Sequence, residues 1–532
     1  MHQRPDNTSK IDASNQRKLA GVTIIVSFLS LAGKLLGIAR SVILAAIFGA
    51  SASLDAFWIA YMIPMMLPSI LRNLVMTAFI PQFMKSLDGS NEREKWDGAN
   101  ALFTILFLLI LSASVLMFAA APYIIKLISP GLSDQTQELA VILARIMIVS
   151  SIFMALNSIL SAIAFSLNKF LSASLESFVT NIVTITMVLL WSKQYGIHIL
   201  AISVVVGFFI QFLIQLKINF HHVKHYLRIS FNIKHRDFIE SIQHMLPLTV
   251  GLVSAWLMGM VDKIFASYLQ EGSISALSYA ETISWLPVEI FATAIMTTFF
   301  PQLSRQYANR NMAEMAETQL KGLRVLIIIM LPFTVLFILF ATQIVGFLLQ
   351  RGSFTEQSTL LTSSAVICLS IGILARSISY FNYRFIHAIR EPWTQVKIGL
   401  IGVVTNICFN AILIKPFGLA GVALATSIAL IQSSILSTLV VQKKLGIKLV
   451  LKLLQPLSIS AVLAIGMGSI AFLISNIVNQ YISVNHTTSK FLVEMSGIPI
   501  AVVLVTILGV LFKQREILFM YTIVKEKILR TK

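Results

Sequence analysis

Long apolar blocks follow one another along almost the whole chain, separated by short polar segments. A helix needs about 20 apolar residues to cross the hydrocarbon layer of a bilayer, and each block reaches about that length. The pattern therefore predicts an all-α integral membrane protein with about fourteen membrane-spanning helices. The predicted spans are 19–48, 56–84, 99–129, 137–168, 171–192, 197–219, 240–269, 275–304, 321–349, 359–388, 394–415, 419–441, 452–479 and 490–515.

The composition and the distribution of charge agree with this class. Hydrophobic residues make up 57% of the chain and charged residues 12%, whereas soluble domains carry roughly 25% charged residues. The formal net charge of +18 is a property that nucleic-acid-binding proteins share. Here, however, the basic residues gather in alternate loops, Arg310 and Arg390 among them, as in the cytoplasmic loops of membrane proteins. We therefore expect no nucleic-acid partner. The opposite loops carry few basic residues, namely Lys193, Arg351, Lys415 and Lys490.

The loop charges also predict the orientation of the chain. About fourteen spans place both termini on one side of the membrane, and the basic loops place that side in the cytoplasm. We expect the polar start, 1–18, and the basic end, 516–532, to be cytoplasmic tails. The first apolar block is too long for a cleavable signal peptide.

A loose internal repeat predicts two related halves. Phe79–Phe83 recurs as Phe299–Leu303, and Phe178–Asn181 recurs as Val403–Asn406, both at a spacing of roughly 220 residues. Each half contains six predicted helices. Because that number is even, both halves enter the membrane with the same orientation, and a cavity is expected between them. The predicted parts are an N-lobe over 19–219, a basic linker over 220–239, a C-lobe over 240–441 and two additional helices over 452–515.

Basic residues inside the predicted spans are the candidates for binding a substrate. A cation in the middle of a membrane costs at least roughly 2.5–3.5 kcal/mol unless it faces protein or water. Lys34 and Arg40 share the first span, which contains no acid. They predict a polar cavity that is cationic on balance, and the planar fork of arginine suits phosphate oxygens in particular. The further candidates for the cavity are Arg72, Arg145, Arg376 and Arg384.

Acidic residues inside the spans are fewer and allow two interpretations. They form ion pairs that lock the helices together, or they take part in gating. The candidates inside the spans are Asp262 with the adjacent Lys263, and Glu281, while Glu176 and Glu289 complete the set. Asp55, near the outer end of the second span, is a further candidate.

The motifs of catalysis and of nucleotide binding are missing from the sequence. There is no phosphate-binding G-x-x-x-x-G-K-[ST] loop, no H-E-x-x-H and no pair of aspartates in an outer loop. We therefore expect a transporter without catalytic residues, metal or cofactor. Its energy would come from an ion gradient, the membrane potential or the gradient of its substrate.

Several runs resemble a known family. Gly33–Arg40, Ile47–Ala50, Asp55–Phe57 and Phe79–Pro81 resemble the start of the MviN/MurJ family, the lipid II flippases of the multidrug/oligosaccharidyl-lipid/polysaccharide exporter superfamily. Later segments are similar to the same family, namely Ile264–Ser267, Tyr279–Glu281, Pro301–Ser304 and Gly418–Ser427.

The resemblance implies a cavity between two lobes, alternating access and a polyprenyl-pyrophosphate-linked peptidoglycan precursor as the substrate. It places the family's two first-helix cations on Lys34 and Arg40 and its cavity-mouth aspartate on Asp55. It places a groove for the polyprenyl tail on the last two helices. It implies a monomer in the bacterial cytoplasmic membrane, with membrane lipids and the lipid-linked substrate as partners.

The sequence departs from the family at two positions. The family's eighth-helix arginine is Thr282 here, and its second-helix arginine falls near Pro68 or Ser69. Arg72 lies about one turn further along the same helix and is the candidate to replace it. The substrate therefore stays open between lipid II and another polyprenyl-linked glycan, such as an exopolysaccharide or O-antigen unit. A cation-coupled drug exporter is a weaker alternative because it would favour an acidic cavity. The coupling ion is also open.

Overall fold

The computed structural model describes residues 7–74, 92–166, 171–226, 253–254, 256–481, 491, 493 and 495–500. Within these ranges, every regular element is a helix. Ten of the described helices are long and apolar enough to cross a membrane. The predicted all-α membrane fold is confirmed.

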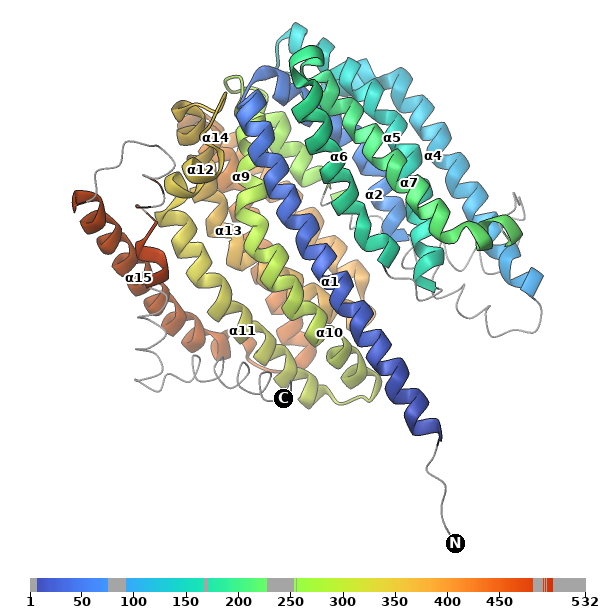
Figure 1. The fold of residues 1–532 in the computed structure, drawn as a ribbon. Helices are drawn as coiled ribbons and strands as arrows, with labels where there is room; N and C mark the ends of the chain where they lie inside the picture. The colour runs from blue at the N-terminus through green and yellow to red at the C-terminus, as the bar shows by residue number, and fades with distance from the viewer. Residues whose placement is uncertain are drawn as a thin grey trace. The chain divides into compact units, whose positions relative to one another are not determined.

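The described residues fall into two compact units. The first unit holds the residues up to 226, except for the short segments 45–55 and 128–132, which belong to the second. Within the first unit, α5 packs against α7, and α6 packs against α7 (Figure 1). Its helices are α1 (Asn7–Phe48), α2 (Ala52–Leu74), α4 (Glu92–Ile128), α5 (Asp134–Ser166), α6 (Leu171–Tyr195) and α7 (His198–Tyr226).

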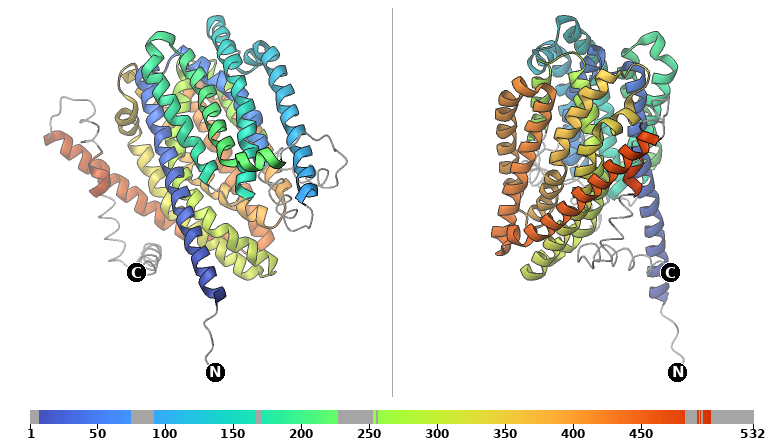
Figure 2. Two further views of the ribbon diagram at one scale, coloured as in Figure 1. Left: turned by 45° about the vertical axis from the view of Figure 1, so that its right-hand side comes forward. Right: turned by 90° about the vertical axis from the view of Figure 1, so that its left-hand side faces the viewer.

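Besides the segments 45–55 and 128–132, the second unit contains a helical segment over 256–266. Its most extensive helix packing joins α13 to α14 and α11 to both α13 and α15. Figure 2 shows α15 lying obliquely against α11 at the edge of this unit. Its further helices are α9 (Ser273–Pro287), the π-helix η2 (Val288–Ala292), α10 (Thr293–Ala308), α11 (Met312–Leu339), α12 (Ala341–Leu349), α13 (Glu356–Ala388), α14 (Pro392–Leu445) and α15 (Leu449–Tyr481).

The described helices follow the predicted spans in order, with differences at their ends and breaks. Helix α1 begins at Asn7, so the helix continues beyond its apolar span, Phe28–Phe48, into the segment predicted as a polar tail. The predicted span 321–349 consists of α11 and α12, which are separated at Phe340. The predicted span 275–304 is continuous through α9, η2 and α10. The last predicted span, 490–515, lies almost wholly outside the described residues.

Helix α14 is a hairpin of two arms, which are the predicted spans 394–415 and 419–441. The chain reverses at Gly418, whose φ of 54° and ψ of −128° lie outside the helical region. The arms run antiparallel, since Thr405 bonds to Gln432 and Asn406 bonds to Thr426 across them. The hairpin therefore brings polar side chains from both arms into one layer inside the unit.

The hairpin depends on a glycine just after the turn. A methyl group at Gly421 would clash with the carbonyl oxygen of Leu413 in the opposite arm. We expect Gly421→Ala to destabilise the protein by about 1–3 kcal/mol, because a backbone atom cannot move aside as a side chain can. Thermal unfolding in detergent measures this. Gly466→Ala in α15 is the control, since a methyl group at that position would meet open space. This substitution should leave the stability unchanged or raise it slightly. Equal melting temperatures for the two variants would contradict the role given to Gly421.

Candidate functional site

In the first unit, α1 and α6 approach each other at a glycine face of α1. A Cβ atom at Gly33 would lie 3.0 Å from Cβ of Ser177, and Asn181 Nδ2 donates to the carbonyl oxygen of Gly33 at 3.1 Å. Gly37, one turn further along α1, also faces Asn181. The two helices therefore run in the same direction. This agrees with the predicted order of spans, in which α1 is the first and α6 the fifth.

The two predicted cations of the first helix lie beside this contact. Lys34 and Arg40 are both half-buried. Within the described part of the chain, Nε of Arg40 is buried and has no hydrogen-bond partner. Tyr61 of α2 lies close enough to both Arg40 and Glu176 of α6 to interact with them electrostatically. The sequence showed that the first span carries no acid, but it did not show that α6 brings Glu176 to the same region.

The other predicted cavity arginines divide into three groups. The position of Arg72 on α2 is described, but its side chain lies outside the described residues. Arg145 donates from Nε to the carbonyl oxygen of Phe118 at 3.4 Å and lies over that ring. In the second unit, Arg376 lies 4.2 Å from the ring centroid of Trp285, and Arg384 lies 5.7 Å from that of Phe300. Arg145, Arg376 and Arg384 therefore each make a cation–π contact within their own unit.

A buried acid sits at the centre of the α14 hairpin. Asp262 is 2% exposed. Its Oδ1 accepts from Nδ2 of Asn406 and of Asn410, both at 2.9 Å, and its Oδ2 accepts from Oγ1 of Thr426 at 2.6 Å. The segment 256–266 thus inserts a carboxylate between the two arms of α14. We call Asp262, Asn406, Asn410 and Thr426 the Asp262 cluster.

The Asp262 cluster contains unsatisfied oxygen atoms. Among the described residues, Oδ1 of Asn406 and Oδ1 of Asn410 are buried without a hydrogen-bond partner. A carboxylate, two amide oxygens and a hydroxyl are all oxygen ligands, which hard cations prefer. If both amides turned over, their oxygens would face the carboxylate and could hold a small cation. Within the described residues, no group of three or more His, Cys, Asp or Glu side chains could hold a metal ion.

The neighbouring charges form a second layer around this cluster. Lys263 interacts electrostatically with Glu281 of α9 and with the adjacent Asp262. Glu281 in turn interacts with Lys263, Asp262 and Arg376. Consecutive helical residues point in different directions, so Asp262 can face α14 while Lys263 faces α9. Both predicted interpretations, ion pairing and gating, stay predictions for this group.

Asp55 holds the segment 45–55 to the start of α9, entirely within the second unit. The carboxylate is 1% exposed. Its Oδ2 accepts from Gly272 N at 2.6 Å, and its Oδ1 accepts from Ser275 N at 2.7 Å and from Ser275 Oγ at 2.5 Å. It therefore caps α9, whose preceding residue, Gly272, supplies no side chain. A negative charge at the N-terminus of a helix is also favoured by the helix dipole.

Two further contacts extend this connection, which we call the Asp55 latch. Ser353 N donates to the carbonyl oxygen of Ala46 at 2.8 Å, and the hydroxyl of Tyr279 donates to that of Gly49 at 3.4 Å. Gly272 has a φ of 86°, and a Cβ atom there would lie 2.5 Å from the carbonyl oxygen of Ala50. The backbones are thus so close that only glycine fits. The latch joins 45–55 to the segments 272–279 and 350–354.

Thr282 lies one turn beyond the latch on α9. Its side chain is exposed, and its hydroxyl donates to the carbonyl oxygen of Ser278 at 2.9 Å. The position at which the resemblance expects an arginine therefore carries a small neutral group.

These features can be compared with known proteins. The family model described as lipid II flippase MurJ matches residues 44–514. The chain belongs to the MurJ family. The match contains the Asp55 latch, the Asp262 cluster and both arms of the α14 hairpin.

Individual members and solved structures agree with this assignment. A probable lipid II flippase MurJ of Buchnera aphidicola subsp. Schizaphis graminum is 30% identical over 413 residues, which cover 76% of this chain and 80% of the relative. The lipid II flippase MurJ of Burkholderia cenocepacia is 26% identical over 434 residues, which cover 79% and 83%. A MurJ structure in an inward closed conformation superposes with a TM-score of 0.77 at 25% identity, covering 92% of this chain and 99% of the other. An inward-facing multidrug transporter of the MATE family shares the fold, with a TM-score of 0.65 at 16% identity.

Proposed function

We propose that this chain is a lipid II flippase, which moves the polyprenyl-pyrophosphate-linked peptidoglycan precursor from the inner to the outer leaflet of the bacterial cytoplasmic membrane. The observation that carries the proposal is its membership of the MurJ family over residues 44–514. The chain acts as a transporter and catalyses no covalent step. It works by alternating access, as a monomer with both termini in the cytoplasm.

Lys34 and Arg40 bind the pyrophosphate of the substrate in this proposal. Support comes from their half-buried positions on α1 and from the buried Nε of Arg40, which has no partner among the described residues. A guanidinium can donate two parallel hydrogen bonds to phosphate oxygens. Tyr61 lies close enough to both Arg40 and Glu176 to interact with them electrostatically.

The Asp55 latch and the Asp262 cluster have separate roles in the cycle. The latch joins the turn between α1 and α2 to the start of α9. The orientation predicted from the loop charges places these helix ends on the outer side of the membrane. We propose that it opens when the substrate is released to the outer leaflet. The Asp262 cluster is the proposed site of a coupling cation, because it combines a buried carboxylate with two unsatisfied amide oxygens.

Transport of labelled lipid II by the purified chain in liposomes tests the proposal. We expect Arg40→Ala to reduce flipping roughly tenfold or more, because hydrogen bonds to a charged group contribute about 1.5–3 kcal/mol. Arg40→Lys should retain part of the activity, since it keeps the charge but loses the fork. Arg305→Ala, which removes an exposed arginine from α10, is the control.

Two results would redirect or reject the proposal. Normal flipping by Arg40→Ala at a matched amount of protein would remove the cationic site from the mechanism. A wild-type chain that moves another polyprenyl-linked glycan but not lipid II would support the alternative substrate. Thr282 favours keeping that alternative in the assay, because a neutral side chain stands where the family resemblance expects an arginine.

A further inference from the structure

Two turns of the second unit place an arginine where helices usually end in glycine. Arg310 follows α10 with a φ of 54°, and Arg390 follows α13 with a φ of 59°. Within the described part of the chain, they are the only residues other than glycine with a positive φ. A side chain disfavours this left-handed conformation, and glycine is the usual residue at such a position.

The two turns are built in the same way. After α10, Arg310 N donates to the carbonyl oxygen of Tyr307 at 2.9 Å and Asn311 N donates to that of Gln306 at 2.9 Å. The turn after α13 repeats this pair of bonds. Arg390 N donates to the carbonyl oxygen of His387 at 3.1 Å, and Glu391 N donates to the carbonyl oxygen of Ile386 at 3.1 Å. This pattern of two bonds is a standard helix C-terminus. Nothing in the backbone of either turn requires arginine, so the reason for it lies in the side chains.

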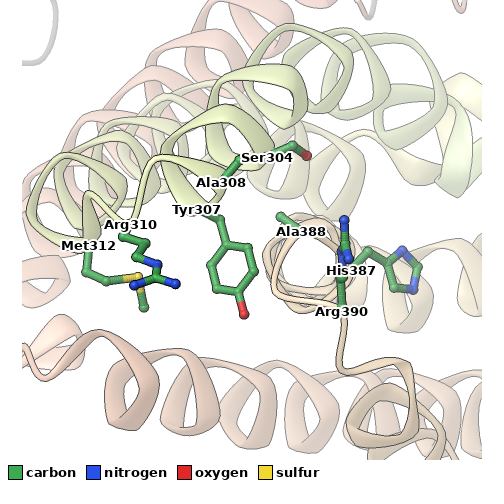
Figure 3. Close-up of a pocket in the computed structure, with 8 residues that line it drawn as sticks. All are labelled: Ser304, Tyr307, Ala308, Arg310, Met312, His387, Ala388 and Arg390. Carbon is green, nitrogen blue, oxygen red and sulfur yellow. The ribbon is translucent and has the colours of Figure 1, made fainter.

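Both arginines line one cavity. Tyr307, Arg310, His387 and Arg390 surround a space of about 830 Å³, a volume within the range of small-molecule sites. Figure 3 shows Tyr307 and Arg310 coming from the end of α10, and His387 and Arg390 from the end of α13. Both arginines are exposed. Among the described residues, neither guanidinium has a hydrogen-bond or ion-pair partner.

The acids of these two turns are already engaged. Glu391, next to Arg390, forms an ion pair with Lys444. Glu314 accepts from Asn311 Nδ2 at 2.9 Å. The cavity therefore keeps two positive charges that are not neutralised locally. In addition, α11 and α14 begin directly after the arginine turns, and the N-terminus of a helix carries partial positive charge.

We propose that this cavity binds a phosphate group, with Arg310 and Arg390 as its charged ligands and Tyr307 as a further hydrogen-bond donor. Two planar forks on opposite sides suit a tetrahedral anion with several oxygens better than a carboxylate, which one fork can satisfy. The phosphate belongs either to the head group of an anionic phospholipid or to a soluble phosphate compound. The site lies within the second unit and uses neither Lys34 nor Arg40, so it is separate from the proposed transport site.

The experiment compares binding with stability in the full-length chain. The test variant is the double substitution Arg310→Gly and Arg390→Gly, because glycine suits the left-handed conformation. Its melting temperature should equal or exceed that of the wild type, so a loss of binding would not reflect unfolding. The control is Arg305→Gln with Arg324→Gln, which removes two exposed arginines that do not line the cavity.

Two probes distinguish the sources of the phosphate. Inorganic pyrophosphate is titrated calorimetrically into protein in neutral detergent, with Arg40→Ala present in every chain compared, so that the proposed transport site does not contribute to the binding. Separately, native mass spectrometry measures how many phosphatidylglycerol molecules each protein retains, compared with the number of phosphatidylcholine molecules. We expect at least one probe to bind to the wild type and to the control, and to bind to the glycine variant at least roughly tenfold more weakly. Pyrophosphate binding indicates a soluble ligand, and selective retention of phosphatidylglycerol alone indicates a lipid head group. The proposal is overturned if the wild type binds neither probe, or if the glycine variant binds both as the wild type does.

Discussion

Replacing Asp55 with asparagine should reduce lipid flipping roughly tenfold or more, although the two side chains have almost the same shape. The carboxylate accepts bonds from Gly272 N, Ser275 N and Ser275 Oγ. Asparagine has only one acceptor oxygen, so its amide nitrogen would face a backbone N–H. A buried donor left without an acceptor costs about 1–3 kcal/mol, and the charge that favours the start of α9 is lost as well.

Hydrogen exchange tests the local part of this expectation. Amides at 272–279 and at 45–55 should exchange faster in Asp55→Asn, while those of α14 should not change. Ser275→Ala, which removes only the hydroxyl bond, should have a smaller effect on both exchange and flipping. Asp134→Asn is the matched control, because Asp134 also lies in the first turn of its helix but is exposed. Unchanged exchange with reduced flipping would mean that Asp55 acts on the substrate and not on the latch.

The fold could be predicted largely because the bilayer fixes the length of an apolar helix. Every described helix corresponds to a predicted span, and the reversal inside α14 falls at Gly418, between two predicted spans. The break between α11 and α12 was not predicted. It falls at Phe340, where neither glycine nor proline marks it in the sequence.

The candidate sites could be predicted less completely. Charges inside a span stand out because of their cost, so Arg40 and Asp262 were found from the sequence, whereas Asp55, at the end of a span, was singled out by the family resemblance. Asn410 and Thr426 were not found, because neutral polar residues are common in membrane helices. Asn406 did carry a signal, since it recurs with Asn181 in the internal repeat. Both asparagines bind another helix of their own unit.

The arginine turns show a different limit. Arg310 and Arg390 were counted only as basic residues of predicted cytoplasmic loops. Glycine is the usual sequence signal for a positive φ, and at these two positions the sequence has arginine instead, so the positive φ could not be predicted. Only the backbone of the structure separates these two residues from the other exposed arginines.

Replacing Asp262 with asparagine should abolish stabilisation of the protein by a monovalent cation. If the Asp262 cluster binds such a cation, the wild-type melting temperature should rise with the concentration of the cation at constant ionic strength. A ligand present at a hundred times its dissociation constant stabilises the folded state by about 2.7 kcal/mol. Na⁺ and K⁺ are compared, with choline as the ion that is too large for the cluster. Asn410→Ala should weaken the response, because it removes one of the two amide oxygens.

The same variant separates coupling from transport. Asp262 lies in the second unit, whereas the proposed phosphate ligands Lys34 and Arg40 lie in the first. Asp262→Asn should therefore remove the dependence of flipping on the cation gradient, while Arg40→Ala should remove flipping but leave the thermal response to the cation intact. Asp134→Asn again serves as the control for a lost carboxylate. If Asp262→Asn responds to the cation as the wild type does, the coupling site is not the Asp262 cluster. The buried carboxylate then serves to hold the α14 hairpin together, and the flippase proposal, which rests on the family match over residues 44–514, is unaffected.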